Sequence, residues 1–161
     1  MADKPQHATF TLERSYSTPP ERVFAAFADP EARAQWSAGP NDAFLYDHAD
    51  FREGGRDQFR CGPKNDPKLR GETIYHQIVP NKRIISTETL DSNGQRLAIS
   101  LTTLEFEPHA DGTNLKLTVQ LVSLVGPAMI AGYESGNKTA LENLARYLRL
   151  VQHQQREIAL E

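Results

Sequence analysis

The sequence predicts an α+β fold in which a curved antiparallel sheet of about six to seven strands wraps around a long C-terminal helix, with two short helices after the first strand. Three observations predict it. The segment Pro127–Gln152 carries apolar residues at helical spacing. The segments before it are short and rich in β-branched residues, and tight-turn pairs such as Asn93-Gly94 and Asp111-Gly112 separate them. Finally, helices and strands are segregated along the chain instead of alternating, which argues against a parallel sheet.

The chain is expected to begin with one strand and two short helices. Apolar and polar side chains alternate over Thr9–Tyr16, as in a half-buried strand. The sequence Thr18-Pro-Pro-Glu21 matches a capping box, so we expect the Thr18 hydroxyl to cap the first helix. Asp29-Pro-Glu31 predicts the start of a second helix, which carries Trp36, the only tryptophan.

Six further strands are predicted between breaker-rich turns, at Ala43–Phe51, Arg56–Cys61, Leu69–Val79, Arg83–Leu90, Arg96–Glu107 and Asn114–Leu121. In the last of them, alternate residues from Leu115 to Leu121 are apolar and should face the core. In the strand before it, the apolar positions are odd-numbered up to Leu101 and even-numbered from Leu104. This change of phase predicts a β-bulge near Thr102-Thr103.

The C-terminal helix should bury one stripe of side chains, formed by Ile130, Tyr133, Asn137, Leu141, Leu144, Leu148 and Val151. Gly126-Pro127 suits its start, because proline is tolerated at the first helical position. A straight helix cannot contact all of a curved sheet, so we expect a cavity between the two. Asn137 is the one amide near the centre of this apolar stripe, and it either contacts a ligand or water in the cavity or bonds to backbone.

Length and composition restrict the class of protein. The 161 residues fit a single domain, expected at 8–152 with flanking tails at 1–7 and 153–161. A net charge of −3 gives no electrostatic footprint for nucleic acid, and no apolar run approaches the ~20 residues of a membrane span. Cys61 is the only cysteine, so disulfides and thiolate metal clusters are not expected. The polar N-terminus lacks a signal-peptide pattern, and cytoplasmic residence is the default expectation.

Several motifs together carry a family resemblance. They are Thr18–Phe27 followed by Asp29-Pro-Glu31 and Trp36, Asp50–Gly55, Pro80–Ile85, Asp111–Thr113 and Ala140–Leu148. They resemble the START-like, helix-grip (SRPBCC) superfamily and, within it, bacterial relatives of the Hsp90-ATPase-activator (Aha1-type) domain. The resemblance spans roughly Thr9 to Leu150. Many relatives carry tryptophan where this chain has Asn137, and some carry an acidic residue where it has Val119. The superfamily includes lipid carriers, hormone receptors, polyketide cyclases and co-chaperones, so the resemblance implies the fold more narrowly than the function.

The candidate site is the cavity, and its expected lining is Trp36, Phe59, Tyr75, Glu88, Met129, Tyr133, Asn137 and Leu141. Trp36 can plug the cavity mouth or dock its short helix, and the Tyr133 hydroxyl can meet a ligand or lie at the rim. We assign no catalytic residue, metal ligand or cofactor. Asp47 and His48 point to opposite faces of a strand, His76 fits a surface histidine, and Cys61 fits a buried structural thiol.

The leading functional interpretation is a domain that binds a small apolar or amphipathic molecule in this cavity. The sequence leaves open whether it is an enzyme and leans against it. A polyketide-cyclase-like enzyme is the first alternative, and a converging histidine or carboxylate pair in the cavity would favour it. A co-chaperone-like interaction module is the second alternative, and a defined protein partner without a bound small molecule would favour it. Domains of this kind often pair through an exposed surface, so a homodimer is compatible with the sequence.

Overall fold

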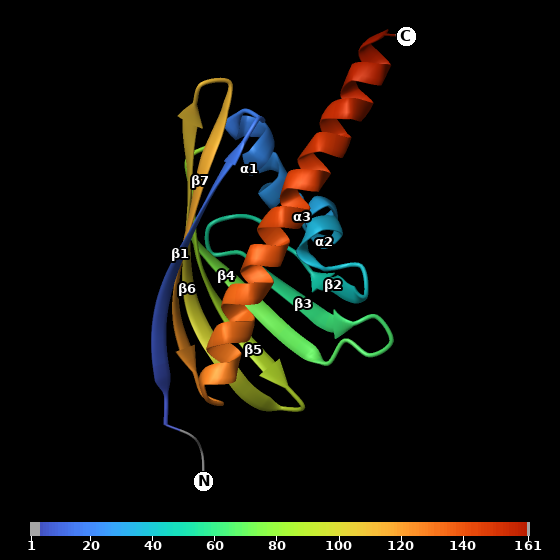
Figure 1. Cartoon of the computed structure of the whole chain (residues 1–161). Coiled ribbons are helices and arrows are strands. Elements are labelled where there is room, and N and C mark those ends of the chain that lie inside the picture. The colour runs from blue at the N-terminus through green and yellow to red at the C-terminus, as the bar shows by residue number, and fades with distance from the viewer. Residues whose placement is uncertain (1–3, 161) are drawn as a thin grey trace.

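The structure is a computed structural model that describes residues 4–160. Seven strands and three helices follow one another as β1 (Gln6–Tyr16), α1 (Pro20–Ala28), α2 (Pro30–Ser37), β2 (Asp42–His48), β3 (Arg56–Pro63), β4 (Leu69–Val79), β5 (Arg83–Ser92), β6 (Gln95–His109), β7 (Gly112–Ser123) and α3 (Pro127–Leu160). The helix α3 crosses the concave side of the sheet diagonally, and its last turns project beyond the sheet (Figure 1). This arrangement confirms the predicted α+β, helix-grip fold.

The seven strands form one antiparallel sheet in the order β1-β7-β6-β5-β4-β3-β2. From β2 to β7, each strand pairs with the next strand in the sequence. The connection from β1 to β2 instead runs through α1 and α2. The turn after β5 is Asn93-Gly94, both at positive φ, as predicted for a two-residue hairpin. The next turn is Ala110-Asp111 and not Asp111-Gly112, because Gly112 already pairs with His109. Gly112 is closely packed there, since an added Cβ would lie 2.0 Å from the Tyr16 carbonyl oxygen.

The predicted bulge in β6 was placed wrongly. The register between β5 and β6 shifts where Leu90 pairs with Ala98 and Asp91 pairs with Arg96, which places the extra residue at Leu97. From there Ala98 and Ser100 face the interior, and Ile99 and Leu101 are exposed on the outer face. The apolar pattern misled the prediction because, in this part of the strand, the small and polar residues Ala98 and Ser100 face the interior instead of Ile99 and Leu101.

The predicted cap at Thr18 is also wrong. The first helix starts at Pro20 with Pro19 at the cap position, and no side chain bonds to its free N–H groups. Thr18 is instead buried, and its carbonyl oxygen accepts a hydrogen bond from the Thr113 hydroxyl at 2.6 Å. The second start is as predicted, because an Asp29 side-chain oxygen accepts from the Glu31 N–H at 3.0 Å.

The helix α3 is longer than predicted and continues to Leu160 instead of ending at Gln152. Of the two expected tails, Gln6 and His7 belong to β1 and residues 153–160 belong to α3, while residues 1–3 and 161 lie outside the described residues. Within residues 4–160, no helix is both long enough and apolar enough to cross a membrane.

The main core lies under the middle of α3. Leu141, Leu144 and Leu148 of the predicted stripe are buried there against the inward residues of β1, β6 and β7. Leu115, Leu117, Val119 and Leu121 face this core as predicted. A buried hydrogen bond also links β1 to α3, because the Tyr16 hydroxyl donates to the Leu141 carbonyl oxygen at 3.1 Å. Ile130, Tyr133 and Asn137, in the first half of the helix, are only partly buried.

Candidate ligand cavity

A cavity of about 500 Å³ lies between the first half of α3, the helix α2 and the inner face of β2–β5. Most of its wall is aromatic or aliphatic, and two clusters of hydrogen-bonded polar side chains lie along it. The predicted residues that line it are Trp36, Phe59, Tyr75, Glu88, Tyr133, Asn137 and Leu141. Met129 was also predicted, but it packs against the hydrophobic core and does not line the cavity.

Trp36 joins the two short helices and forms part of the cavity wall. Its indole Nε1 donates to the Ala26 carbonyl oxygen at 3.1 Å, and its ring meets the Phe27 ring edge-on with centroids 4.8 Å apart. The side chain is buried. Of the two roles considered for Trp36, the geometry therefore favours docking of α2 onto α1.

Phe59 forms another part of the wall and depends on a glycine for its position. It pairs directly with Gly71 across β3 and β4, and its ring lies over the glycine. A Cβ atom added at Gly71 would lie 2.0 Å from the ring, well inside van der Waals contact. Phe59 also stacks on Phe44 with centroids 4.6 Å apart, so this glycine supports a row of aromatic rings at the cavity edge.

Gly71→Ala is expected to destabilise the protein by about 1–3 kcal/mol, because the Phe59 ring must move and the site is overpacked. Gly132→Ala is the matched control. Gly132 is an exposed helical glycine with open space around it, so the same change there should stabilise by about 0.5–1 kcal/mol. Urea unfolding of both variants measures the difference, and a shift of the same sign in both would contradict this account of Phe59.

The first polar cluster of the cavity is a buried ion pair. Arg33 of α2 lies 2.9 Å from Asp57 of β3 (Nη1 to Oδ2), and the Tyr75 hydroxyl of β4 hydrogen bonds to both partners. The other Asp57 oxygen accepts from the Asp50 N–H at 2.9 Å. Burial lowers the pKa of Arg33, whereas Tyr46, Tyr75 and Asp57 raise it. Together the three neighbours outweigh burial, so the pKa lies above its usual value. Arg33 is therefore charged throughout the physiological range.

Arg33 leaves one edge of its guanidinium group without a protein partner. Nε and Nη2 are buried and have no hydrogen-bond acceptor within residues 4–160. The guanidinium carbon lies 4.9 Å from the centre of the Tyr46 ring, so part of its charge is balanced by an aromatic face. Buried donors without acceptors cost free energy. A ligand or water that supplied an acceptor at this edge would remove that cost.

The second polar cluster joins α3 to the sheet. The Tyr133 hydroxyl donates to Glu88 Oε1 of β5 and lies 2.9 Å from the Ser100 hydroxyl of β6. Burial raises the pKa of Glu88, although hydrogen bonds from Tyr133 and Thr73 lower it. Burial and the nearby Glu88 raise the pKa of Tyr133 as well. This cluster therefore combines a carboxyl group that resists ionisation with two hydroxyl groups.

Asn137 lies one turn after Tyr133 and lines the cavity with it. Its Nδ2 donates to the Tyr133 carbonyl oxygen at 2.9 Å, within the same helix. The bond is therefore to helix backbone and not to a strand. Because the side chain is only partly buried, Asn137 is not a close-packed core residue.

Sequence reasoning missed several cavity residues, including Arg33, Tyr46, Phe51 and Asp57. Asp57 shares a strand face with Phe59, which indicates an inward position. Its charge, however, is typical of an exposed residue. Asn143 was missed too. Its Nδ2 donates to the Ala38 carbonyl oxygen at 3.2 Å and ties α3 to the end of α2.

The remaining candidate residues have ordinary surroundings. His76 lies on the surface, with Nε2 2.7 Å from the Thr87 hydroxyl. Asp47 accepts two hydrogen bonds from Nε and one from Nη2 of Arg60, at 3.0–3.2 Å. Cys61 lines the cavity, and burial together with Glu88 and Asp42 raises its pKa to about 11. At neutral pH this thiol is protonated and therefore a poor nucleophile.

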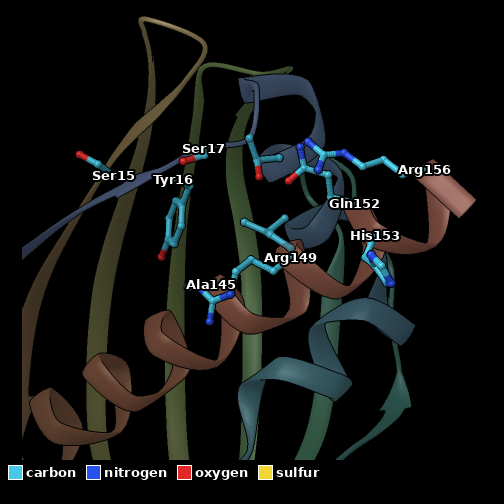
Figure 2. A pocket seen from close by; sticks show the side chains of 10 residues that line it. Ser15, Tyr16, Ser17, Ala145, Arg149, Gln152, His153 and Arg156 are labelled. Atoms are coloured by element: carbon cyan, nitrogen blue, oxygen red, sulfur yellow. The ribbon is translucent and has the colours of Figure 1, made fainter.

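A second hollow of about 460 Å³ lies on the surface, where the distal part of α3 passes the end of β1 (Figure 2). Its lining is mostly polar and includes two arginines. Figure 2 shows that these do not converge, because Arg156 reaches toward Gln152 whereas Arg149 points back along the helix toward Ala145. Without a shared focus for these charges, the hollow makes a poorer ligand site than the cavity.

Comparison with known proteins identifies the family. The sequence model of the family described as "Activator of Hsp90 ATPase homolog 1-like protein" matches residues 17–149. The crystal structure of the Mll3558 protein from Rhizobium loti is similar, with 35% identity, a TM-score of 0.81 and coverage of 90% of this chain and 99% of that one. A protein from Rhizobium leguminosarum shares 32% identity, with a TM-score of 0.80 and coverage of 91% and 97%. Protein CV1439 from Chromobacterium violaceum shares 28% identity, with a TM-score of 0.77 and coverage of 86% and 94%. No curated protein matches the chain. The family model covers most of the chain, and the chain therefore belongs to the Activator of Hsp90 ATPase homolog 1-like protein family, with the START-like fold of its bacterial members.

Proposed function

We propose that this protein binds a small, largely apolar molecule in the cavity between α3 and the sheet. The observation that carries the proposal is the cavity itself, about 500 Å³ with mostly apolar walls and a few inward polar groups. Ligand pockets in proteins have this size and this mixture of surfaces. Arg33 and Glu88 add support, because both side chains line the cavity and give a bound molecule polar groups to contact.

Two observations favour binding over the polyketide-cyclase alternative. A cyclase of this kind would need titratable groups that converge on a substrate. The two interior carboxyl groups belong instead to separate clusters, with Asp57 engaged by Arg33 and Glu88 by Tyr133. The cavity residues Tyr46 and Tyr75 have raised pKa values through burial, so neither is a ready base at neutral pH.

Asn137→Trp tests the proposal by filling the cavity. We expect the variant to be at least as stable as the wild type, because the indole buries apolar surface at ~25 cal/mol per Å² and only one bond within the helix is lost. Binding of the neutral fluorescent probe N-phenyl-1-naphthylamine, and any small molecule seen by native mass spectrometry of the purified wild type, should be lost.

Lys138→Trp is the matched control, since it adds the same side chain at the neighbouring exposed position. It should leave probe binding unchanged. A clear drop in the melting temperature of Asn137→Trp would show that the site is already close-packed. Unchanged probe binding in that variant would show that the probe does not enter the cavity, and the proposed function would then lose its support.

A further inference from the structure

We propose that Glu88 acts in the cavity as an uncharged carboxylic acid that donates a hydrogen bond to a neutral oxygen acceptor of the ligand, of the kind a ketone carbonyl provides. This inference rests on the proposed function and narrows it to a ligand class. It predicts a preference for uncharged carbonyl compounds over carboxylates of the same length.

The hydrogen-bond pattern around Glu88 leaves room for such a donor. Tyr133 donates its only hydroxyl proton to Oε1 of Glu88, so the Ser100 hydroxyl must donate to the Tyr133 oxygen in turn. Oε1 is therefore occupied as an acceptor, and the carboxyl group accepts a further hydrogen bond from Thr73. A proton on the carboxyl group would lie on Oε2, and part of the Glu88 surface faces the cavity. A protonated carboxyl offers one O–H donor, whereas an ionised one offers only acceptors.

The surroundings of Glu88 favour this protonated form. Among residues 4–160, no basic side chain forms an ion pair with it, since Arg33 is used by Asp57. An unpaired charge inside a protein is costly, so a buried carboxyl group without a cation tends to hold its proton. The raised pKa of Glu88 agrees with this geometry.

The groups that face Glu88 do not themselves titrate near neutral pH. Tyr133 comes from α3, Tyr46 from β2 and Cys61 from β3, and burial raises the pKa of each, that of Cys61 to about 11. Thr73 of β4 and Ser100 of β6 supply only hydroxyl groups. A change of ligand affinity with pH that Glu88→Gln abolishes can therefore be attributed to Glu88.

The experiment measures displacement of N-phenyl-1-naphthylamine by 2-dodecanone and by dodecanoate, with the wild type and Glu88→Gln. With wild type near pH 6, we expect 2-dodecanone to bind about tenfold more tightly than dodecanoate, the effect of one good hydrogen bond. Its affinity should fall about tenfold as the pH rises through the pKa of Glu88, because the donor is lost. Glu88→Gln keeps an N–H donor and cannot ionise, so it should bind the ketone with no such pH dependence.

Infrared difference spectra give a readout that needs no ligand. At a pH where exposed carboxyl groups are ionised, the wild type should show the carbonyl band of a protonated carboxylic acid, and Glu88→Gln should lack it. A missing band, equal affinity for dodecanoate, or pH-independent ketone binding by the wild type would overturn the inference. If the probe binds and Asn137→Trp abolishes that binding, but the affinity for the ketone does not depend on the protonation of Glu88, only this inference fails. If neither probe nor ketone enters the cavity, the proposed function fails with it.

Discussion

Arg33→Met is expected to lower the free energy of unfolding by about 3–5 kcal/mol, the loss typical of breaking a buried ion pair. The side chains of Arg33 and Asp57 are only 8% and 1% exposed, and their charged atoms lie 2.9 Å apart. Methionine has a similar length and fills most of the space. The loss therefore comes chiefly from Asp57, which would stay buried without its cation. Urea unfolding at neutral pH measures it.

Two further variants separate this explanation from a general sensitivity to lost arginines. Arg52→Met breaks an ion pair of similar length, 2.8 Å to Asp50, but Arg52 is 76% exposed, so the change should cost no more than about 1 kcal/mol. The double variant Arg33→Met/Asp57→Leu removes both buried charges and should recover much of the stability that the single variant loses. Equal losses in Arg33→Met and Arg52→Met would refute the role given to the buried pair.

The fold was predictable because its main elements repeat one simple pattern over many residues. Alternation from Leu115 to Leu121 identified the inner face of β7, and the stripe through Leu141 and Leu144 identified the buried face of α3. Details set by single contacts were not predictable. The bulge lies at Leu97, and beyond it Ser100 faces Tyr133. The hydrophobic pattern of the strand does not indicate this position of the bulge.

Periodic patterns predicted several of the residues that line the cavity. Tyr133, Asn137 and Leu141 lie one turn apart on α3, and Phe59 lies on an inward strand position. Met129 continues the same helical spacing, but at the start of α3 the side chain meets the core instead of the cavity.

Arg33 lines the cavity although the sequence did not predict it, the reverse of the case of Met129. Charged side chains are normally exposed, and an arginine in a short helix gives no sign that its partner lies on a distant strand. Asp57 lies 24 residues further along the chain, and only the packing of α2 against the end of the sheet brings the two together. A sequence pattern cannot show such a pair, because each residue alone is typical of an exposed charged side chain.

Leu144→Ala is expected to destabilise the protein by about 2–5 kcal/mol while leaving the cavity intact. Leu144 is fully buried in the core, at 0% exposure, and it does not line the cavity. Leu150→Ala is the matched control on the same helix, where the leucine is 64% exposed and the expected change is within about 0.5 kcal/mol. Below the melting transition, Leu144→Ala should bind N-phenyl-1-naphthylamine as tightly as the wild type, the reverse of Asn137→Trp. Stability and probe binding that fall together would mean that core and cavity form one cooperative unit, whereas a loss below about 1 kcal/mol would mean that α3 is held mainly by other contacts.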